Sequence, residues 1–452
     1  MCSARPKAAV QAAPVENLPC AMKLVHDSAD TTGGITETPI SAAAHELRRL
    51  LASRSVGAEA MARSLALALE RWRDAADPVR RETLEQMADS LGFSQELLGQ
   101  SIEALVKPFT SEALRMLAGR IVNEARLVGF VMAGNVPGAG LHELCLALLS
   151  GAAAIVKTSV REQHFFMAFA RMLREVDPEA GRRCVVFAWP RSRTDLSAAL
   201  ARQCDLLAAF GADESLARLR ENSSGPIAVP EASSGTGALL IGFGSRVSAA
   251  ALAKGALNGQ NCETLAQAVA RDVTLFEQRG CLSPHHVFVE GDATTGRRFA
   301  TELARALGSL SRSMPPARLA LEDAVAVRRW REVVRWRALA GERVALFEGE
   351  RLGWAVAFDP AGEFTMSPAY RNVTVSTYRC VRELVDRLAA AAERLEAFAC
   401  APAPDAELAG ALRDLGVSYV CAPGEMQSAP PWWEHGGGAF ARLLARSAGC
   451  NE

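Results

Sequence analysis

The feature of this sequence that most limits its fold is an alternation of short apolar segments and helical stretches between residues 127 and 210. The apolar segments predict strands at 127–133, 152–157, 184–189 and 206–210, and the stretches between them predict helices at 141–149, 165–176 and 196–203. Repeated strand–helix units with apolar strands predict a parallel sheet covered on both faces. In such a sheet a ligand binds beyond the carboxyl ends of the strands.

The remaining regions of the chain predict further helices and a second sheet. Residues 39–119 have helical periodicity, whereas residues 1–40 lack periodicity and predict a loose tail. A Gly/Ser/Pro-rich break at 222–238 marks a domain change, and a helical run is predicted at 249–274. The second alternating region predicts strands at 287–290, 354–358 and 373–377, with helices at about 296–307, 319–339, 381–395 and 406–415. We therefore predict an α/β protein with a tail (1–40), a parallel-sheet domain with N-terminal helices (41–240), a second α/β domain (241–425) and a C-terminal segment (426–452) that returns across the cleft.

Composition limits the kinds of molecule that this protein is expected to bind and the cell compartment in which it is expected to occur. The formal net charge is -1 over 452 residues, so no global field favours nucleic acid or an anionic membrane, and a small-molecule partner is expected. No apolar run is long enough for a membrane span, and the N-terminus does not resemble a secretory signal. The eleven cysteines include no Cys-x-x-Cys, and the seven histidines are scattered, which predicts free thiols, no metal site and a cytoplasmic protein.

One predicted helix, near 326–339, carries five arginines around two tryptophans. A basic, aromatic stripe can bind nucleic acid or the phosphates of a substrate. The single Glu332 and the near-neutral chain favour instead a solvated helix face with its apolar residues turned inward.

A cysteine between a glycine and a predicted strand is the first candidate for chemistry. The segment reads Gln278-Arg279-Gly280-Cys281-Leu282-Ser283-Pro284-His285. A cysteine at the mouth of a strand suits a nucleophile exposed to a ligand, although the same residues are compatible with a buried structural thiol.

Two upstream turns place polar side chains at the ends of predicted strands. The first, Gly134-Asn135-Val136-Pro137-Gly138, is neither a Walker loop nor a Gly-x-Gly-x-x-Gly fingerprint. Its Asn135 amide can donate to an oxyanion, or it can simply form the turn. The second strand ends in Lys157-Thr158-Ser159, which can hold ribose hydroxyls or a phosphate, or can be a solvated strand end.

In this order, the Asn135 turn, the Lys157–Ser159 strand end, a Phe210-Gly211 loop and Gly280-Cys281 resemble the aldehyde dehydrogenase superfamily. Within it, the chain resembles the long-chain acyl-CoA reductases, the fatty acid reductase component of bacterial bioluminescence and its relatives. The segments that carry this resemblance are Cys281-Leu282-Ser283-Pro284, Gly134-Asn135-Val136-Pro137-Gly138 and Pro431-Trp432-Trp433-Glu434-His435-Gly436-Gly437. The resemblance runs from about residue 40 to the C-terminus.

The resemblance implies an aldehyde-dehydrogenase-like fold, with NADPH or NADH bound by the domain at 41–240 and a catalytic domain at 241–425. It implies that Cys281 takes the acyl group from a fatty acyl-CoA, while Asn135 and the Cys281 N–H hold the oxyanion. Lys157 and Ser159 would contact the adenosine side of the cofactor, and Gly211 would lie in the loop passing it. The implied reaction is reduction of acyl-CoA to aldehyde with release of CoA. A homo-oligomer, or an acyl-ligase or transferase partner, is compatible with this reading.

Two departures from ordinary aldehyde dehydrogenases bear on the chemistry. Those enzymes usually carry a glutamate base in the stretch that here reads Ile241-Gly242-Phe243-Gly244-Ser245-Arg246. Its absence disfavours hydrolysis of an acyl-enzyme, although Glu231 or Glu263 could substitute for it. Arg371 stands where a glutamate commonly steadies the nicotinamide ribose.

Two nearby histidines and two alternative functions bear on this interpretation. His285 and His286 lie close to Cys281 in the sequence, but neighbours along a strand point to opposite faces, which argues against a Cys–His pair. The alternatives to an acyl-CoA reductase are an aldehyde dehydrogenase that forms free acid and a non-catalytic scaffold subunit with the same fold.

Overall fold

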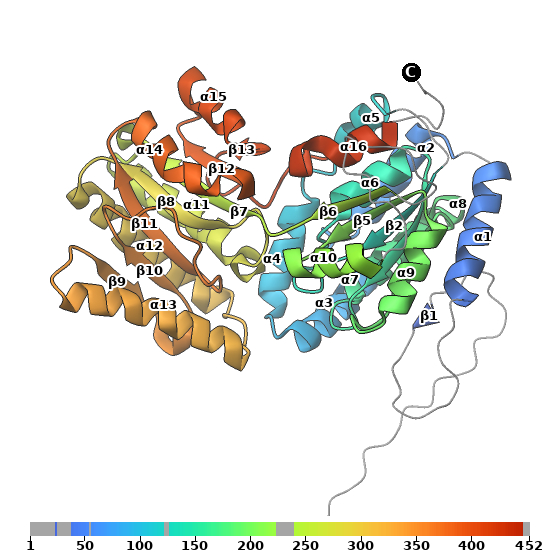
Figure 1. The fold of residues 1–452 in the computed structure, drawn as a ribbon, viewed down its shortest axis with the longest axis horizontal. Coiled ribbons are helices and arrows are strands. Elements are labelled where there is room, and N and C mark those ends of the chain that lie inside the picture. The colour runs from blue at the N-terminus through green and yellow to red at the C-terminus, as the bar shows by residue number, and fades with distance from the viewer. Residues whose placement is uncertain (1–22, 25–37, 54–55, 122–125, 223–238, 446–452) are drawn as a thin grey trace, which may run out of the picture.

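The computed structural model describes residues 23–24, 38–53, 56–121, 126–222 and 239–445, which form two lobes, each built on a parallel sheet (Figure 1). The first sheet has six strands in the order β1-β4-β3-β2-β5-β6, all parallel. Its strands are β1 (Lys23–Leu24), β2 (Leu127–Val131), β3 (Ala153–Thr158), β4 (Cys184–Ala188), β5 (Leu206–Phe210) and β6 (Leu239–Phe243). The predicted α/β class with parallel sheets is confirmed.

The second sheet has seven strands in the order β13-β12-β7-β8-β11-β10-β9, and only the β9–β10 pair is antiparallel. Its strands are β7 (Val247–Leu252), β8 (Pro284–Glu290), β9 (Ala345–Glu348), β10 (Ala355–Phe358), β11 (Asn372–Tyr378), β12 (Leu395–Ala401) and β13 (Tyr419–Cys421). The predicted domain boundaries remain predictions; the one at 240 falls within β6, and the predicted tail and the 222–238 break lie largely outside the described residues.

Helices cover both sheets. Before the first sheet come α1 (Thr38–Ser53), α2 (Ala58–Glu70), α3 (Pro78–Leu91), α4 (Gln95–Val106) and α5 (Ser111–Ala118). Within the first lobe lie α6 (Leu141–Leu149), α7 (His164–Val176), α8 (Pro178–Gly181), α9 (Thr194–Gln203) and α10 (Asp213–Asn222). The second lobe contains α11 (Gln260–Thr274), α12 (Ala293–Ser313), α13 (Leu321–Leu339), α14 (Val381–Leu388) and α15 (Ala406–Asp414). The last helix, α16 (Ala439–Ala445), returns to the first lobe, where Phe440 packs against Phe130 (Figure 1).

The apolar strands are explained by the cores on both faces of each sheet. Along β3, Ala154 and Val156 belong to one buried cluster, whereas Ala153 and Ile155 belong to another. Successive side chains of a strand point to opposite faces, so a strand buried on both faces must be apolar throughout.

Two sequence predictions in the second lobe are wrong. The stretch 249–274 is not one helix, because its first residues form β7, and α11 begins only at Gln260. The helix predicted at 381–395 ends at Leu388 and is followed by a 3₁₀ segment (Ala389–Arg394), after which the chain enters β12. The first error falls in an alanine-rich segment, in which strong helix formers occupy a strand buried between two neighbouring strands. In the second, the alanines that follow Leu388 remain helical, but in a 3₁₀ turn that ends where β12 begins.

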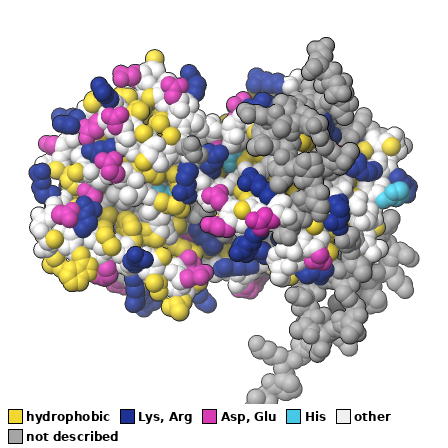
Figure 2. All heavy atoms as spheres, viewed as in Figure 1, with side chains coloured by type: hydrophobic (Ala, Val, Ile, Leu, Met, Phe, Trp, Pro, Cys, Tyr) yellow, Lys and Arg dark blue, Asp and Glu magenta, His cyan; other side chains and the backbone are white. Residues whose placement is uncertain are grey.

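The arginine-rich helix α13 differs from its prediction in part. Arg331 is buried and pairs with Glu348, and Arg337 pairs with Asp359. The apolar Trp336, in contrast, is 69% exposed, because α13 contacts the lobe only along a narrow face. On the face seen in Figure 2, basic and acidic side chains are interspersed.

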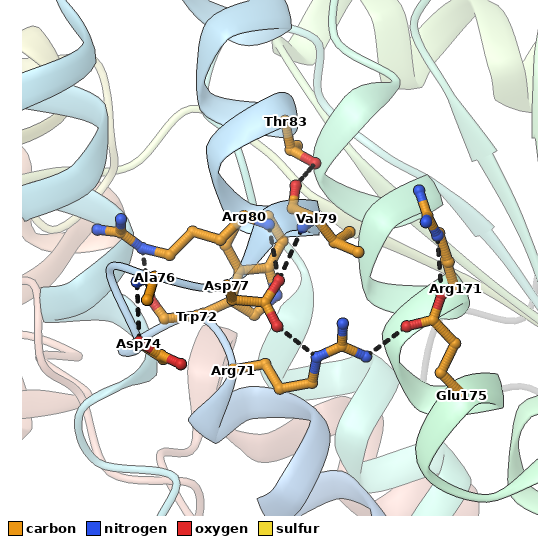
Figure 3. A network of polar contacts seen from close by, with 10 residues as sticks. All are labelled: Arg71, Trp72, Asp74, Ala76, Asp77, Val79, Arg80, Thr83, Arg171 and Glu175. Carbon is orange, nitrogen blue, oxygen red and sulfur yellow. Dashed lines mark hydrogen bonds and ion pairs between the residues drawn. The ribbon is translucent and has the colours of Figure 1, made fainter.

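A polar network ties the N-terminal helices to the first lobe (Figure 3). Arg71, at the end of α2, donates to Asp77 over 2.7 Å and to Glu175 of α7 over 2.6 Å. Asp77 also caps α3 by accepting from the N–H groups of Val79 and Arg80. One guanidinium thus joins three helices, and the carboxylate that it holds also satisfies the orphan N–H groups of a helix start.

Candidate active site

A cavity of about 310 Å³ lies where loops of both lobes meet. From the first lobe it is lined by the turn after β2, including Asn135, and by Gly211 after β5. The strand order of the first sheet reverses direction between β2 and β5, and the crevice at such a switch point is the usual ligand site of parallel sheets. From the second lobe and the C-terminal segment come Cys281 and His435.

Cys281 is a half-buried residue of the loop that enters β8. Its carbonyl oxygen accepts a hydrogen bond from Ser248 of β7 over 2.6 Å, and among the described residues its own N–H has no hydrogen-bond partner. Cys184 and Cys400, in contrast, are buried, and burial raises the pKa of each of these two thiols to about 12 and keeps it protonated. Cys281 faces the cavity and its backbone is held by Ser248, so its thiol is placed to act as a nucleophile and its own N–H is available to a ligand.

The Cys281 loop follows a backbone segment in an unusual conformation. Phe276, Glu277 and Gln278 all have positive φ, between 53° and 59°. A second left-handed segment ends at Arg371, which forms a fully buried ion pair with Glu277. The backbone N–H of Tyr370 also donates to the Glu277 carbonyl over 2.9 Å. These contacts hold the strained turn that leads to Cys281, and they show that Arg371 is occupied within the core.

His435 is the functional candidate that the sequence reasoning missed. Its side chain lines the same cavity as Cys281, close enough for the thiol to affect its pKa, and its Nδ1 lies 2.7 Å from Oε1 of Glu143. Burial alone would lower the pKa of His435, but the Glu143 carboxylate and Cys281 raise that pKa well above its usual value. Burial alone would raise the pKa of Glu143, but His435 and His142 hold it below its usual value. The signal was present, since His435 lies in the C-terminal motif that carried the family resemblance.

The remaining predicted site residues fall into two groups. Asn135 and Gly211 line the same cavity as Cys281. Lys157 and Ser159 do not line it; they lie at the carboxyl end of β3, next to the turn that carries Asn135. The two turns are in close contact, because a Cβ placed on Gly134 would lie 2.5 Å from Ser159. Burial and the charge of Arg191 lower the pKa of Lys157 to about 8.

Among the described residues, the cavity wall offers no free carboxylate to act as a base in hydrolysis. The stretch that lacks the usual glutamate contributes Phe243, Gly244, Ser245 and Arg246 to its wall. Among the described lining residues Glu143 is the only carboxylate, and it is engaged by His435. Of the two glutamates that could replace the missing base, Glu263 is exposed on α11 and does not line the cavity, and Glu231 lies outside the described residues.

The two histidines next to Cys281 in the sequence take no part in the cavity. His285 and His286 are buried and contact Ser367 and Ser376, each over 2.8 Å. Burial lowers the pKa of His285 to about 4 and that of His286 to about 3, so both are neutral at physiological pH.

Comparison with known proteins agrees with the resemblance. The family model described as acyl-CoA reductase (LuxC) matches residues 122–446. A long-chain acyl-protein thioester reductase of Aliivibrio fischeri is 23% identical over 260 residues, which cover 56% of this chain and 49% of that protein. The chain thus matches about half the length of this relative.

Solved structures agree on the fold. An oxidoreductase from Marinobacter aquaeolei superposes with a TM-score of 0.65 at 14% identity, covering 87% of this chain and 83% of that one. An NAD-dependent benzaldehyde dehydrogenase from Corynebacterium glutamicum gives a TM-score of 0.64 at 13% identity, covering 90% and 88%. None of the helices in the described ranges is long and apolar enough to cross a bilayer.

Proposed function

The chain belongs to the acyl-CoA reductase (LuxC) family, and we propose that it reduces fatty acyl thioesters, acyl-CoA among them, to aldehydes with NADPH or NADH. The observation that carries this proposal is the position of Cys281 and Asn135 on one cavity at the switch point of the first sheet. A nucleophile, an oxyanion donor and a cofactor crevice are the three parts that such a reduction needs.

The acyl transfer uses groups of this chain alone. The Cys281 sulfur attacks the thioester carbonyl, and the negative charge that forms on oxygen accepts hydrogen bonds from the Asn135 amide and the Cys281 N–H. The bond from carbonyl carbon to the donor's sulfur then breaks, which leaves the acyl group on Cys281.

The residues around the cavity fit a nicotinamide cofactor. The turn from Gly134 to Gly140 and the loop at Gly211 bring backbone, with few side chains, to the switch point. Lys157 and Ser159, at the neighbouring strand end, are suited to ribose hydroxyls or a phosphate. When bound there, the reduced nicotinamide supplies a hydride. After reduction the Cys281–carbon bond breaks, and the aldehyde leaves while the sulfur returns as thiolate.

The acyl donor has two chemical forms to be tested. The Aliivibrio relative is named for reduction of an acyl-protein thioester, so the donor of this chain is either a free acyl-CoA or an acyl group carried by a partner protein such as an acyl ligase or transferase. Both deliver the same thioester to Cys281. A homo-oligomer is compatible with either form.

Mass spectrometry of the protein tests the proposal directly. The protein is exposed to a panel of acyl-CoAs without cofactor, and the peptide that contains Cys281 is analysed for an acyl group. Addition of NADPH or NADH should then release fatty aldehyde and restore the free thiol. Cys281→Ser should abolish both events, whereas Cys380→Ser, which alters an exposed thiol outside the cavity, should change neither.

The same preparation separates the two rival functions. In water without cofactor or thiol, an aldehyde dehydrogenase that forms free acid would lose its acyl group quickly, whereas we expect the acyl-enzyme to persist because the cavity lacks a free carboxylate base. A scaffold subunit would not be labelled by any acyl-CoA or acyl-protein donor.

A further inference from the structure

The His435 ring is held in one orientation by contacts on its faces and its edge. It stacks against Phe243 and against Trp433, with ring centroids 4.4 Å apart in each case. Because Nδ1 is bound to Glu143, the other ring nitrogen is the one that remains for the Cys281 sulfur. A ring stacked on both faces cannot turn away from these two partners.

The charges around the ring favour an imidazolium. Glu143 is only 4% exposed, and its carboxylate is next to the ring nitrogen. The other charged or titratable groups near the ring are His142, Arg246, Arg279 and, behind Arg246, Glu396. His142 is neutral, since burial lowers its pKa more than the nearby Glu143 and the Ala429 carbonyl raise it. A cation beside a sulfur in turn favours the thiolate, which is the nucleophilic form.

We propose that His435 is the general acid of acyl transfer to Cys281 and that Glu143 positions it; this rests on the proposed function. In the resting pair, the thiolate of Cys281 faces the imidazolium of His435. The thiolate attacks the thioester, the carbon–sulfur bond of the donor breaks, and the imidazolium proton moves to the departing thiolate. The donor leaves as a neutral thiol, and His435 is left neutral.

The remainder of the cycle restores the pair with its charges balanced. Reduction of the acyl-enzyme and release of the aldehyde return Cys281 as thiolate, and His435 regains a proton from solvent. The net consumption is one hydride and one proton per aldehyde, as reduction of a thioester to an aldehyde and a thiol requires. Among the described residues that line the cavity, no other acid serves this purpose, because His142 is neutral and the arginines do not release protons.

A leaving-group experiment isolates the proton transfer. His435→Gln should slow acylation by acyl-CoA by about 10²- to 10⁴-fold, the usual contribution of general acid–base catalysis. With a thiophenyl ester of the same fatty acid, whose thiolate departs without a proton, the loss should be much smaller. His45→Gln, on the exposed surface of α1, is the matched control and should leave both rates unchanged. Equal losses on the two esters would overturn the acid role.

A second measurement needs no acyl substrate. The rate of Cys281 alkylation by iodoacetamide, followed on its peptide as a function of pH, reports the thiolate. Glu143→Gln keeps an acceptor for Nδ1 but removes the charge, so its alkylation profile should move to higher pH, as should that of His435→Gln. If both profiles coincide with that of the wild type, the ion pair does not exist. If the profiles shift but no thioester acylates the wild type, the pair stands and the proposed function fails.

Discussion

Glu277→Gln should destabilise the protein far more than the loss of an ordinary ion pair. Glu277 and Arg371 are 1% and 0% exposed, and the guanidinium donates to the Glu277 carboxylate, to Ser311 and to the Met314 carbonyl, while its Nε has no hydrogen-bond partner. The amide would leave a buried cation without a counter-charge, and breaking a buried pair in this way costs about 3–5 kcal/mol.

The same substitution should also disturb the position of Cys281. Phe276, Glu277 and Gln278 are non-glycine residues in left-handed conformations, each of which costs about 1–2 kcal/mol. The turn therefore stores roughly 3–6 kcal/mol of strain, which is comparable with the free energy at stake in the ion pair. Without the pair the turn can relax, and the loop that carries Cys281 moves with it.

Urea unfolding followed by far-UV circular dichroism measures the first effect, and Cys281 labelling by an acyl-CoA in the absence of denaturant measures the second. Glu302→Gln, which removes a partner of the exposed Arg305, is the control and should change the free energy of unfolding by less than about 1 kcal/mol. Replacing both Glu277 and Arg371 by Met should recover most of the stability, because the buried cation is then gone. A Glu277→Gln protein with unchanged stability and normal labelling would refute this reasoning.

Three further substitutions test the cofactor and oxyanion assignments. Asn135→Ala should lower kcat by about 10²- to 10³-fold with the KM for NAD(P)H unchanged, and near-normal turnover would rule out its oxyanion role. Because the pKa of Lys157 is lowered to about 8, the KM for NAD(P)H should rise as the pH passes 8 and the ammonium loses its proton, whereas Lys157→Arg should remove this dependence. Gly134→Ala would place a Cβ 2.5 Å from Ser159 and should destabilise the protein by about 1–3 kcal/mol, whereas Gly57→Ala, which meets open space, should not.

The sequence predicted the four central strands of the first sheet, β2 to β5, because they are apolar on both faces and separated by clear helices, whereas it did not predict the edge strands β1 and β6. In the second lobe local composition was misleading. The stretch Val247–Leu252 contains three consecutive alanines, which favour a helix, yet β7 lies between β12 and β8 in the centre of the sheet. Hydrogen bonds to two neighbouring strands outweigh the weak local preference of alanine, and those neighbours cannot be located from a single sequence.

The residues of the candidate site also fall into two groups, those that a local sequence motif indicates and those that only the fold brings together. Cys281 and Asn135 stand in short motifs of unusual composition, so local reading could single them out. His435 lies 292 residues from the carboxylate that orients it, and Glu143 looks like any acidic residue in the first turn of a helix. The adjacent histidines at 285 and 286 are neighbours of Cys281 along the chain, but their rings contact Ser367 and Ser376. Adjacent residues of a strand point to opposite faces, so they do not share a site. Residues far apart in the sequence, such as Glu143 and His435, can share one when the fold brings their elements together.

The C-terminal segment explains how three distant parts of the chain can form one reactive geometry. Asp272 of α11 accepts hydrogen bonds from the N–H groups of Gly424 and Met426, which attaches the segment to the second lobe. A few residues later, His142 of α6 contacts the Ala429 carbonyl over 3.0 Å, which attaches it to the first lobe. His435 therefore follows a segment fixed to both lobes. Any movement between the lobes must change the distance from the His435 imidazole to Asn135 or to Cys281. Acyl transfer therefore requires a fixed arrangement of the two lobes as well as the three side chains.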